Sequence, residues 1–121
     1  MTLLVCGDRN WKNEKVIEEI LKEQDVDLLI HGNCIGADKI ADKIGKKLGF
    51  KVKTYPADWS LGKKAGPLRN KKMLDENEID LVLAFHDNIK ESTGTKNMLS
   101  QAKKRGIPTL LINSKGGFTE L

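Results

Sequence analysis

The sequence predicts a doubly wound α/β fold, with a parallel five-stranded sheet and helices on both of its faces. Short apolar runs alternate with segments in which apolar residues recur at helical spacing. Most of these runs are continuously apolar rather than alternating, which is typical of parallel strands that are covered on both faces. Because the two patterns alternate along nearly the whole chain, each helix is expected to cross between parallel strands.

The expected strands and helices follow from these two patterns. The apolar runs that predict strands are residues 3–6, 28–30, 52–55, 81–85 and 109–112. Helical stripes lie between them, at residues 16–21, 37–48, 68–74 and 98–102. Gly49 and Gly106 stand where two of the helices would stop, and Pro108 then precedes the last strand. Residues 113–121 form a short C-terminal tail without a clear pattern.

Length and composition narrow the class of protein. At 121 residues, we expect residues 1–121 to form a single domain with one core. The formal net charge of +4 fits an anionic ligand but is too small to imply nucleic acid by itself. Two cysteines, Cys6 and Cys34, do not make a disulfide framework. No apolar stretch has the length of a signal peptide or a membrane span, so a cytoplasmic protein without membrane contact is expected.

Two segments carry the residues that open helices, residues 65–70 and residues 92–95. Proline favours the first helical position, and Ser, Thr or Gly favours the cap before it. The first segment also places Arg69 and Asn70 in the first turn, where a cation opposes the positive end of the helix dipole. That placement is unfavourable unless an anionic group lies there. The two helix starts therefore predict a ligand that carries phosphate.

Unusual residues gather after the carboxyl ends of the expected strands. They lie at residues 7–11, 31–38, 56–59, 66–70, 86–88 and 92–95. The connections at the opposite edge, such as residues 23–25 and 48–50, are plain. Because ligands of doubly wound sheets bind outside the carboxyl ends of the strands, this asymmetry predicts a site there.

Several of these residues allow a structural and a functional interpretation. Gly7, Gly32 and Gly36 either let strands turn into helices or bring backbone N–H groups close to phosphate. They form neither the dinucleotide fingerprint Gly-x-Gly-x-x-Gly nor a phosphate loop with a Lys-Ser/Thr ending. Asp38 either caps or pairs within its own helix, or accepts a hydrogen bond from a ribose hydroxyl.

The aromatic and histidine residues of this edge are also open to two interpretations. Trp11 and Trp59, the only tryptophans, either stack on a base and seal the pocket or cover the core from a loop. His31 and His86 each follow a strand and are expected to be hydrogen-bonded scaffold. No spacing of His, Cys and acidic residues indicates a metal site, and no cofactor is expected.

These segments together resemble the YspA-like branch of the SLOG (SMF/DprA–LOG) superfamily. The matching motifs are Gly7-Asp8-Arg9, Gly32-x-x-x-Gly36-Ala37-Asp38, Pro56-Ala57-Asp58-Trp59, Gly62-Lys63, Ala65-Gly66-Pro67-x-Arg69-Asn70-x-x-Met73 and Ser92-Thr93-Gly94-Thr95. The superfamily groups the DNA-processing protein A fold with the Lonely-guy (LOG) phosphoribohydrolases. The resemblance runs from residue 3 to about residue 112 and implies a Rossmann-like domain that binds a nucleotide or a nucleotide-derived ligand.

The resemblance also bears on catalysis. LOG enzymes pair an arginine, in a segment like that around Arg69, with a glutamate in the segment Gly-Gly-x-Gly-Thr-x-x-Glu. Here the place of that glutamate holds Met98. Cleavage of an N-glycosidic bond needs a carboxylate to stabilise the sugar cation and activate water, and methionine does neither. Asp8, Asp38, Asp58 or Asp87 could substitute, but nothing in the sequence places one of them at the sugar.

The leading hypothesis is therefore binding without turnover of an ADP-ribose-like molecule or a nucleoside phosphate. Arg69 and the helix starts would hold phosphate, the glycines and Arg9 would shape the wall, Asp38 or Asp58 would take ribose hydroxyls, and Trp59 would form a lid or stacking surface. The candidate residues are Gly7, Arg9, Gly32, Gly36, Asp38, Asp58, Trp59, Gly66, Arg69, Asn70, Thr93, Gly94 and Thr95. In a phage, such a protein could be a sponge for an immune nucleotide signal.

Two alternatives and one assembly expectation remain. A nucleotide N-glycosidase or phosphoribohydrolase would use Arg69 and one of the aspartates. Binding of single-stranded DNA is weaker, because only 5% of residues are aromatic and the basic residues form no obvious stripe. A homodimer is expected, because Met73, Leu74 and Met98 offer apolar surface beyond the needs of one domain.

Overall fold

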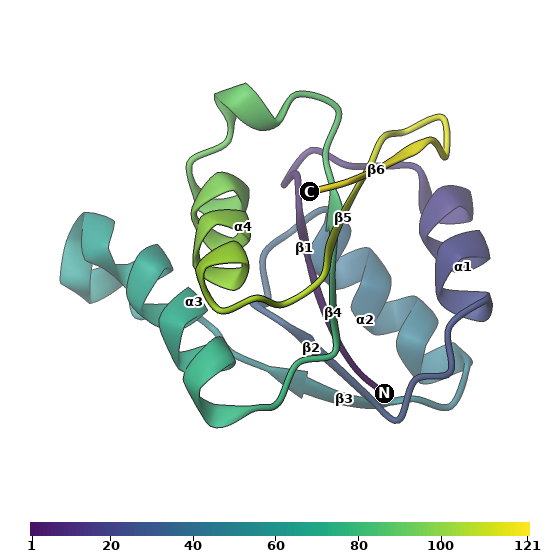
Figure 1. The fold of residues 1–121 in the computed structure, drawn as a ribbon, viewed down its shortest axis with the longest axis horizontal. Helices are drawn as coiled ribbons and strands as arrows, with labels where there is room; N and C mark the ends of the chain where they lie inside the picture. The colour runs from purple at the N-terminus through teal and green to yellow at the C-terminus, as the bar shows by residue number, and fades with distance from the viewer.

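A six-stranded sheet forms the centre of the structure, which is a computed structural model that describes all of residues 1–121 (Figure 1). The strands are β1 (Thr2–Gly7), β2 (Leu28–His31), β3 (Lys51–Thr54), β4 (Leu81–Phe85), β5 (Thr109–Ile112) and β6 (Phe118–Glu120). The α-helices are α1 (Glu14–Lys22), α2 (Ala37–Lys47), α3 (Ala65–Glu76) and α4 (Gly94–Lys104). Two short 3₁₀ helices, η1 (Trp59–Lys64) and η2 (Ile89–Glu91), precede α3 and α4. No helix is both long enough and apolar enough to cross a lipid bilayer.

The strand order is β3-β2-β1-β4-β5-β6. The five strands β1 to β5 pair in parallel, as predicted, and their order places β1 beside β4 at the centre. The prediction of only five strands is wrong, because the tail folds back and pairs β6 antiparallel with β5. A tight turn allows this reversal: the Asn113 N–H donates to the Gly117 carbonyl, and Gly116 has a φ of +87°. All three residues of β6 are exposed, so no apolar pattern marked it in the sequence.

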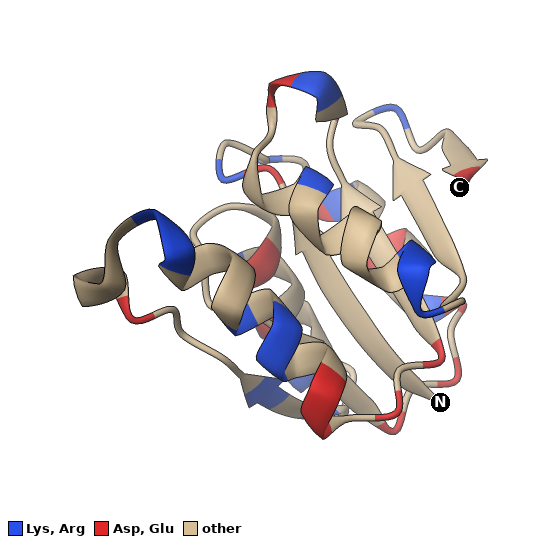
Figure 2. Cartoon of the chain, turned by 60° about the vertical axis from the view of Figure 1, so that its left-hand side comes forward, with Lys and Arg blue, Asp and Glu red and all other residues tan.

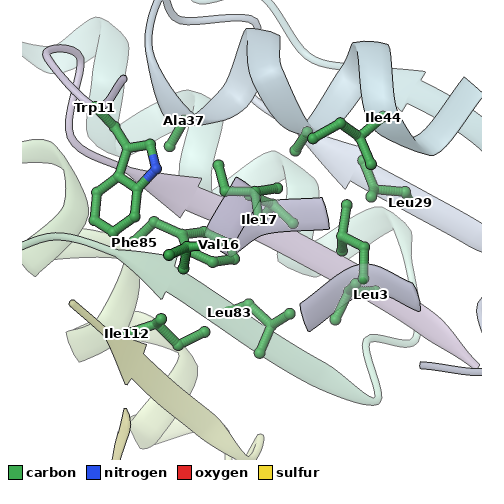
Figure 3. Packing of buried hydrophobic residues seen from close by; sticks show 13 residues of the cluster. Leu3, Trp11, Val16, Ile17, Leu29, Ala37, Ile44, Leu83, Phe85 and Ile112 are labelled. Atoms are coloured by element: carbon green, nitrogen blue, oxygen red, sulfur yellow. The ribbon is translucent and has the colours of Figure 1, made fainter. Parts of the chain in front are cut away.

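Helices cover both faces of the sheet, with α1 and α2 on one face and α3 and α4 on the other (Figure 1). Side chains alternate along β1, so Leu3 and Val5 pack toward α1 and α2, while Leu4 and Cys6 pack toward α3 and α4. Figure 3 shows the first of these two clusters, in which Ile17 of α1 and Ile44 of α2 lie over the sheet. Burial on both faces explains why β1, β2 and β4 read as continuous apolar runs, whereas β3 at the edge of the sheet is largely exposed.

Trp11 belongs to the core and not to the binding edge. Its side chain is 5% exposed and its ring meets that of Phe85 edge-on, with 5.6 Å between the ring centroids (Figure 3). Its indole N–H donates to the Asn13 carbonyl at 2.9 Å, which satisfies the one polar atom of the side chain. Of the two interpretations of Trp11, the one in which it covers the core from a loop is the correct one.

The apolar residues of α3 and α4 are also used within the domain. Met73, Leu74 and Met98 are buried against the sheet in the second core cluster. They therefore offer no free apolar surface, and the reasoning that derived a homodimer from them is wrong. The homodimer itself stays a prediction.

Candidate functional site

A cavity of about 430 Å³ opens at the carboxyl edge of the sheet, between the ends of β1 and β4. The strand order reverses at this point, because α1 carries the chain from β1 to β2 on one side while β4 lies on the other. Connections that diverge from two neighbouring strands leave a crevice, and ligands of doubly wound sheets bind in it. The cavity therefore lies at the edge where the sequence predicted a site.

Most of the predicted site residues line this cavity. They are Gly7, Arg9, Gly32, Asp38, Trp59, Gly66, Arg69, Asn70, Thr93, Gly94 and Thr95. They come from the connections that follow β1, β2, β3 and β4, so residues far apart in the chain meet at one edge. Gly36 and Asp58 are not among the lining residues.

Gly36 and Asp58 instead shape the connections around the cavity. Gly36 has a φ of +82°, and a Cβ atom there would lie 2.3 Å from the carbonyl oxygen of Asp8. Only glycine lets the connection after β2 pack so closely on the connection after β1. The carboxylate of Asp58 accepts hydrogen bonds from the Ser60 N–H at 3.1 Å and the Ser60 hydroxyl at 2.6 Å. Asp58 thus caps the 3₁₀ helix η1.

Arg69 uses most of its N–H donors to link the connection after β2 to the connection after β3. Its Nη1 donates to the carbonyl oxygens of Gly32 and Tyr55, and its Nε donates to Asn70 Oδ1 at 3.0 Å. A Cβ atom on Gly32 would lie 2.3 Å from Nη1, so glycine is needed for this contact. Only Nη2 remains, and its sole neighbour is the sulfur of Cys34 at 3.9 Å. A guanidinium has five N–H donors, so Nη2 is the part still available to a ligand.

This arrangement supplies a second explanation for a cation near the start of α3, where Arg69 is the fifth residue of the helix. The sequence argument required an anionic group there to offset the helix dipole. The carbonyl oxygens of Gly32 and Tyr55 carry partial negative charge and meet that requirement in part. Neighbouring Asn70 is buried, and its amide donates to the Gly94 carbonyl at 3.3 Å and to Asn97 Oδ1 at 3.1 Å. Asn70 thus joins the starts of α3 and α4.

Asp38 contributes a buried acceptor to the cavity wall. Its side chain is 5% exposed, and Oδ2 accepts from the backbone N–H groups of Gly32 and Cys34, each at 3.2 Å. Its other oxygen, Oδ1, is enclosed and has no hydrogen-bond partner. Burial raises the pKa of the Asp38 carboxyl, against the opposing effects of the Cys34 N–H, His31 and Arg69. Leaving such an acceptor unpaired is costly, and because Oδ1 is enclosed, a ligand donor reaches it only if the wall around Asp38 moves.

The start of α4 presents free backbone donors. Within its first turn, the Thr95 N–H donates to Ser92 Oγ at 3.0 Å, while the N–H groups of Thr93 and Gly94 have no acceptor in the protein. The helix begins at Gly94, as the sequence predicted. Unpaired N–H groups and the positive end of the helix dipole together form a site for anions.

The start of α3 differs slightly from the prediction. The helix begins at Ala65, directly after η1, and Pro67 lies within its first turn. Trp59 of η1 is 62% exposed at the rim of the cavity, near Gly66. It lies where a lid or a stacking surface was expected.

Several residues that line the cavity were not among the ligand-binding candidates from the sequence, although Asp8 was weighed as a catalytic carboxylate. They are Val5, Cys6, Asp8, Asn10, Cys34, Met73, His86, Glu91 and Ser92. Cys6 is at the carboxyl end of β1, and its side chain points to the face of the sheet that α3 and α4 cover. Burial raises the pKa of its thiol. His86 could have been found from its place directly after a strand of the predicted sheet. Glu91 gave no signal of its own, because the short helix η2 that carries it was not predicted.

Met98, at the place of the LOG glutamate, lies in the core beneath α4 and not at the cavity. The carboxylates that do line the cavity are those of Asp8, Asp38 and Glu91. No group of three or more His, Cys, Asp or Glu side chains is arranged to hold a metal ion. Basic and acidic residues are interspersed on the face seen in Figure 2.

Comparison with known proteins agrees with these features. A model of the YspA, cpYpsA-related SLOG family matches residues 1–62. The Gene 61 protein of Mycobacterium phage D29 is 34% identical over an alignment of 124 positions, which spans 93% of this chain and 97% of that protein. The chain belongs to the YspA, cpYpsA-related SLOG family. Membership of this SLOG family indicates, at a coarse level, binding of a nucleotide-related ligand.

The two comparisons cover the cavity unequally. The segment matched by the SLOG family runs from β1 to η1 and so includes Gly7, Gly32 and Asp38. Arg69 and the start of α4 lie beyond it, but within the length over which the phage protein is similar. The family assignment therefore rests on the first half of the sheet.

Proposed function

We propose that this SLOG protein binds a nucleotide-derived phosphorylated ligand, ADP-ribose-like or a nucleoside phosphate, and releases it unchanged. The observation that carries the proposal is the start of α4, where the N–H groups of Thr93 and Gly94 lack acceptors beside the cavity. Arg69, whose Nη2 has only the long contact with Cys34 Sγ, lines the same cavity, as does the exposed Arg9. Helix N–H groups and guanidinium groups are donors that bind phosphate.

The size and the second wall of the cavity support a ligand larger than phosphate alone. A volume of about 430 Å³ lies within the range of ordinary small-molecule sites, about 300–1,000 Å³. The carboxylate of Asp38 lines the cavity and, as an acceptor, repels phosphate and suits a ribose hydroxyl instead. Trp59 at the rim offers an aromatic face to a base. These features match a molecule with an anionic part, a sugar and a base.

The absence of turnover is proposed because the position of the LOG glutamate holds a buried methionine. Met98 lies on the face of α4 that packs against the sheet and is fully buried, so no carboxylate acts on a ligand from that position. Retention of a phosphorylated signal without cleavage would make the protein a sensor or a sponge. Similarity to a phage protein makes a sponge for an immune nucleotide signal one such role.

A second candidate function is an N-glycosidase of the phosphoribohydrolase type. The carboxylates of Asp8 and Glu91 line the cavity, and either is a possible replacement for the missing glutamate. Such an enzyme would release free base, because a carboxylate would activate water against the sugar carbon.

One experiment separates these functions. The protein is incubated with AMP, ADP-ribose and NAD, binding is measured by native mass spectrometry, and free base is measured by chromatography. Binding with no release of base supports the proposal. Release of base that Glu91→Gln or Asp8→Asn abolishes would favour the enzyme, and no binding to any of the three would contradict both.

A matched pair of variants on α4 locates the ligand. A Cβ atom on Gly94 meets nothing within 4 Å, so Gly94→Ala is expected to fold, but the methyl group keeps phosphate away from the free N–H groups. We expect a loss of affinity of about tenfold, equivalent to one hydrogen bond to a charged group. Ser100→Ala changes an exposed residue of the same helix and should bind as the wild type does.

A further inference from the structure

The two histidines of the chain occupy matching positions but differ in one hydrogen bond. His31 ends β2 and His86 directly follows β4, and each is nine-tenths buried or more. In each, Nδ1 accepts a backbone N–H from two residues onward, from Asn33 or from Asn88, at 2.9 Å. An Nδ1 that accepts carries no proton, so the proton of the neutral ring is on Nε2 in both histidines.

The Nε2 atoms have different surroundings. Nε2 of His31 lies 2.6 Å from Asp42 Oδ2 and donates to it, so both nitrogens of that ring are satisfied within the protein. Nε2 of His86 has no partner, although His86 is only 9% exposed. Only two side-chain atoms of the protein are both fully enclosed and without a partner, Asp38 Oδ1 and Thr109 Oγ1. Because Nε2 of His86 has no partner and is not one of these two, it is not enclosed. His86 lines the cavity, and we infer that its unenclosed, unpartnered Nε2 faces it.

We propose that His86 is a ligand-binding residue that donates a hydrogen bond from Nε2 to a phosphoryl oxygen. His86 and the free N–H groups of Thr93 and Gly94 belong to one connection, between β4 and α4, and line the same cavity. All three are donors, as a phosphate needs, whereas the unpaired oxygen of Asp38 is an acceptor. The buried Nδ1 contact holds the imidazole ring in one orientation, so binding costs little side-chain entropy.

This inference rests on the proposed function, because it assigns a further residue to the same phosphate. Its test uses two substitutions that each keep one half of the histidine. In His86→Asn, the amide oxygen takes the place of Nδ1 and retains the turn, while the cavity donor is lost. In His86→Gln, the amide nitrogen takes the place of Nε2 and restores that donor.

The affinity for ADP-ribose is measured by calorimetry for both variants and for His31→Asn. We expect His86→Asn to lose about tenfold in affinity, since one hydrogen bond to a charged group is removed. His86→Gln should recover most of that loss, and His31→Asn should bind as the wild type does. Equal affinity of His86→Asn and wild type would overturn the inference alone, as would an equal loss in all three variants. No binding of ADP-ribose or AMP to the wild type would overturn the proposed function and the inference together.

A measurement without substitution covers the case in which a variant does not fold. The chain has only two histidines, so nitrogen NMR of the ring atoms gives two resolved spin systems. Both should show a protonated Nε2 in the free protein. When ADP-ribose is added, the Nε2 signal of His86 should move and that of His31 should not. An unchanged His86 signal at saturation contradicts the proposal.

Discussion

Replacement of Arg69 by alanine is expected to weaken the fold as well as the site. The change removes three hydrogen bonds, to the carbonyl oxygens of Gly32 and Tyr55 and to Asn70 Oδ1. Hydrogen bonds of charged groups contribute about 1.5–3 kcal/mol each. Because the Arg69 side chain is only half-buried, we take about 1 kcal/mol for each of its three hydrogen bonds. The expected loss is about 3 kcal/mol of the free energy of unfolding. With a urea m-value of about 1.5 kcal/mol/M, the unfolding midpoint should fall by about 2 M.

The matched control for Arg69 is Arg105, which pairs with Asp75 on the surface at 2.7 Å. Exposed ion pairs contribute at most about 1 kcal/mol, so Arg105→Ala should move the midpoint by well under 1 M. A shift of the urea midpoint of only about 0.5 M in Arg69→Ala would be no larger than the shift expected for the control. That result would refute the claim that Arg69 holds the two connections together. A loss of ligand by Arg69→Ala is therefore ambiguous until its stability is known.

Three further predictions concern single side chains. Gly32→Ala should displace the guanidinium of Arg69 and cost about 2 kcal/mol in urea unfolding, but little in an Arg69→Ala background. Trp11→Ala should cost about 3–5 kcal/mol because it empties part of the core, whereas Trp59→Ala should leave the unfolding midpoint unchanged and weaken nucleotide binding. Burial raises the pKa of Asp38, so its contribution to stability is complete below the unfolded pKa, near the usual 3.8, and is lost as the pH rises through the folded pKa. Asp38→Asn should therefore be more stable than the wild type at pH 7, with a gain that shrinks toward pH 4; a gain independent of pH would contradict this.

The fold was largely predictable because burial on both faces leaves a clear pattern. Each of the five parallel strands coincides with an apolar run to within two residues at either end. The exception is β6, which is short and exposed, so its pairing with β5 depends on the turn around Gly116 and not on apolar residues. A strand of three residues, all of them exposed, carries no hydrophobic period from which it could be predicted.

The candidate site was predictable as a place but less so as a set of contacts. Parallel strands bring their carboxyl ends to one edge, so the sequence alone brought Gly7, Gly32 and Gly94 to one cavity. Which donors are free was not predictable, because it depends on partners elsewhere in the chain. The guanidinium of Arg69 is largely used by the Gly32 and Tyr55 carbonyls, and the carboxylate of Asp58 is used by Ser60.

The class of fold, the family and the edge of the sheet that carries the candidate site could all be predicted from the sequence. Those properties follow from local patterns of apolar residues, glycines and helix starts, each of which involves residues that are close together in the sequence. The tertiary structure alone decided which polar atoms remain without partners: Asp38 Oδ1, the N–H groups at the start of α4 and Nε2 of His86. Hydrogen bonds between distant residues decide this, since His31 and His86 look alike in sequence and differ only because Asp42 reaches one of them.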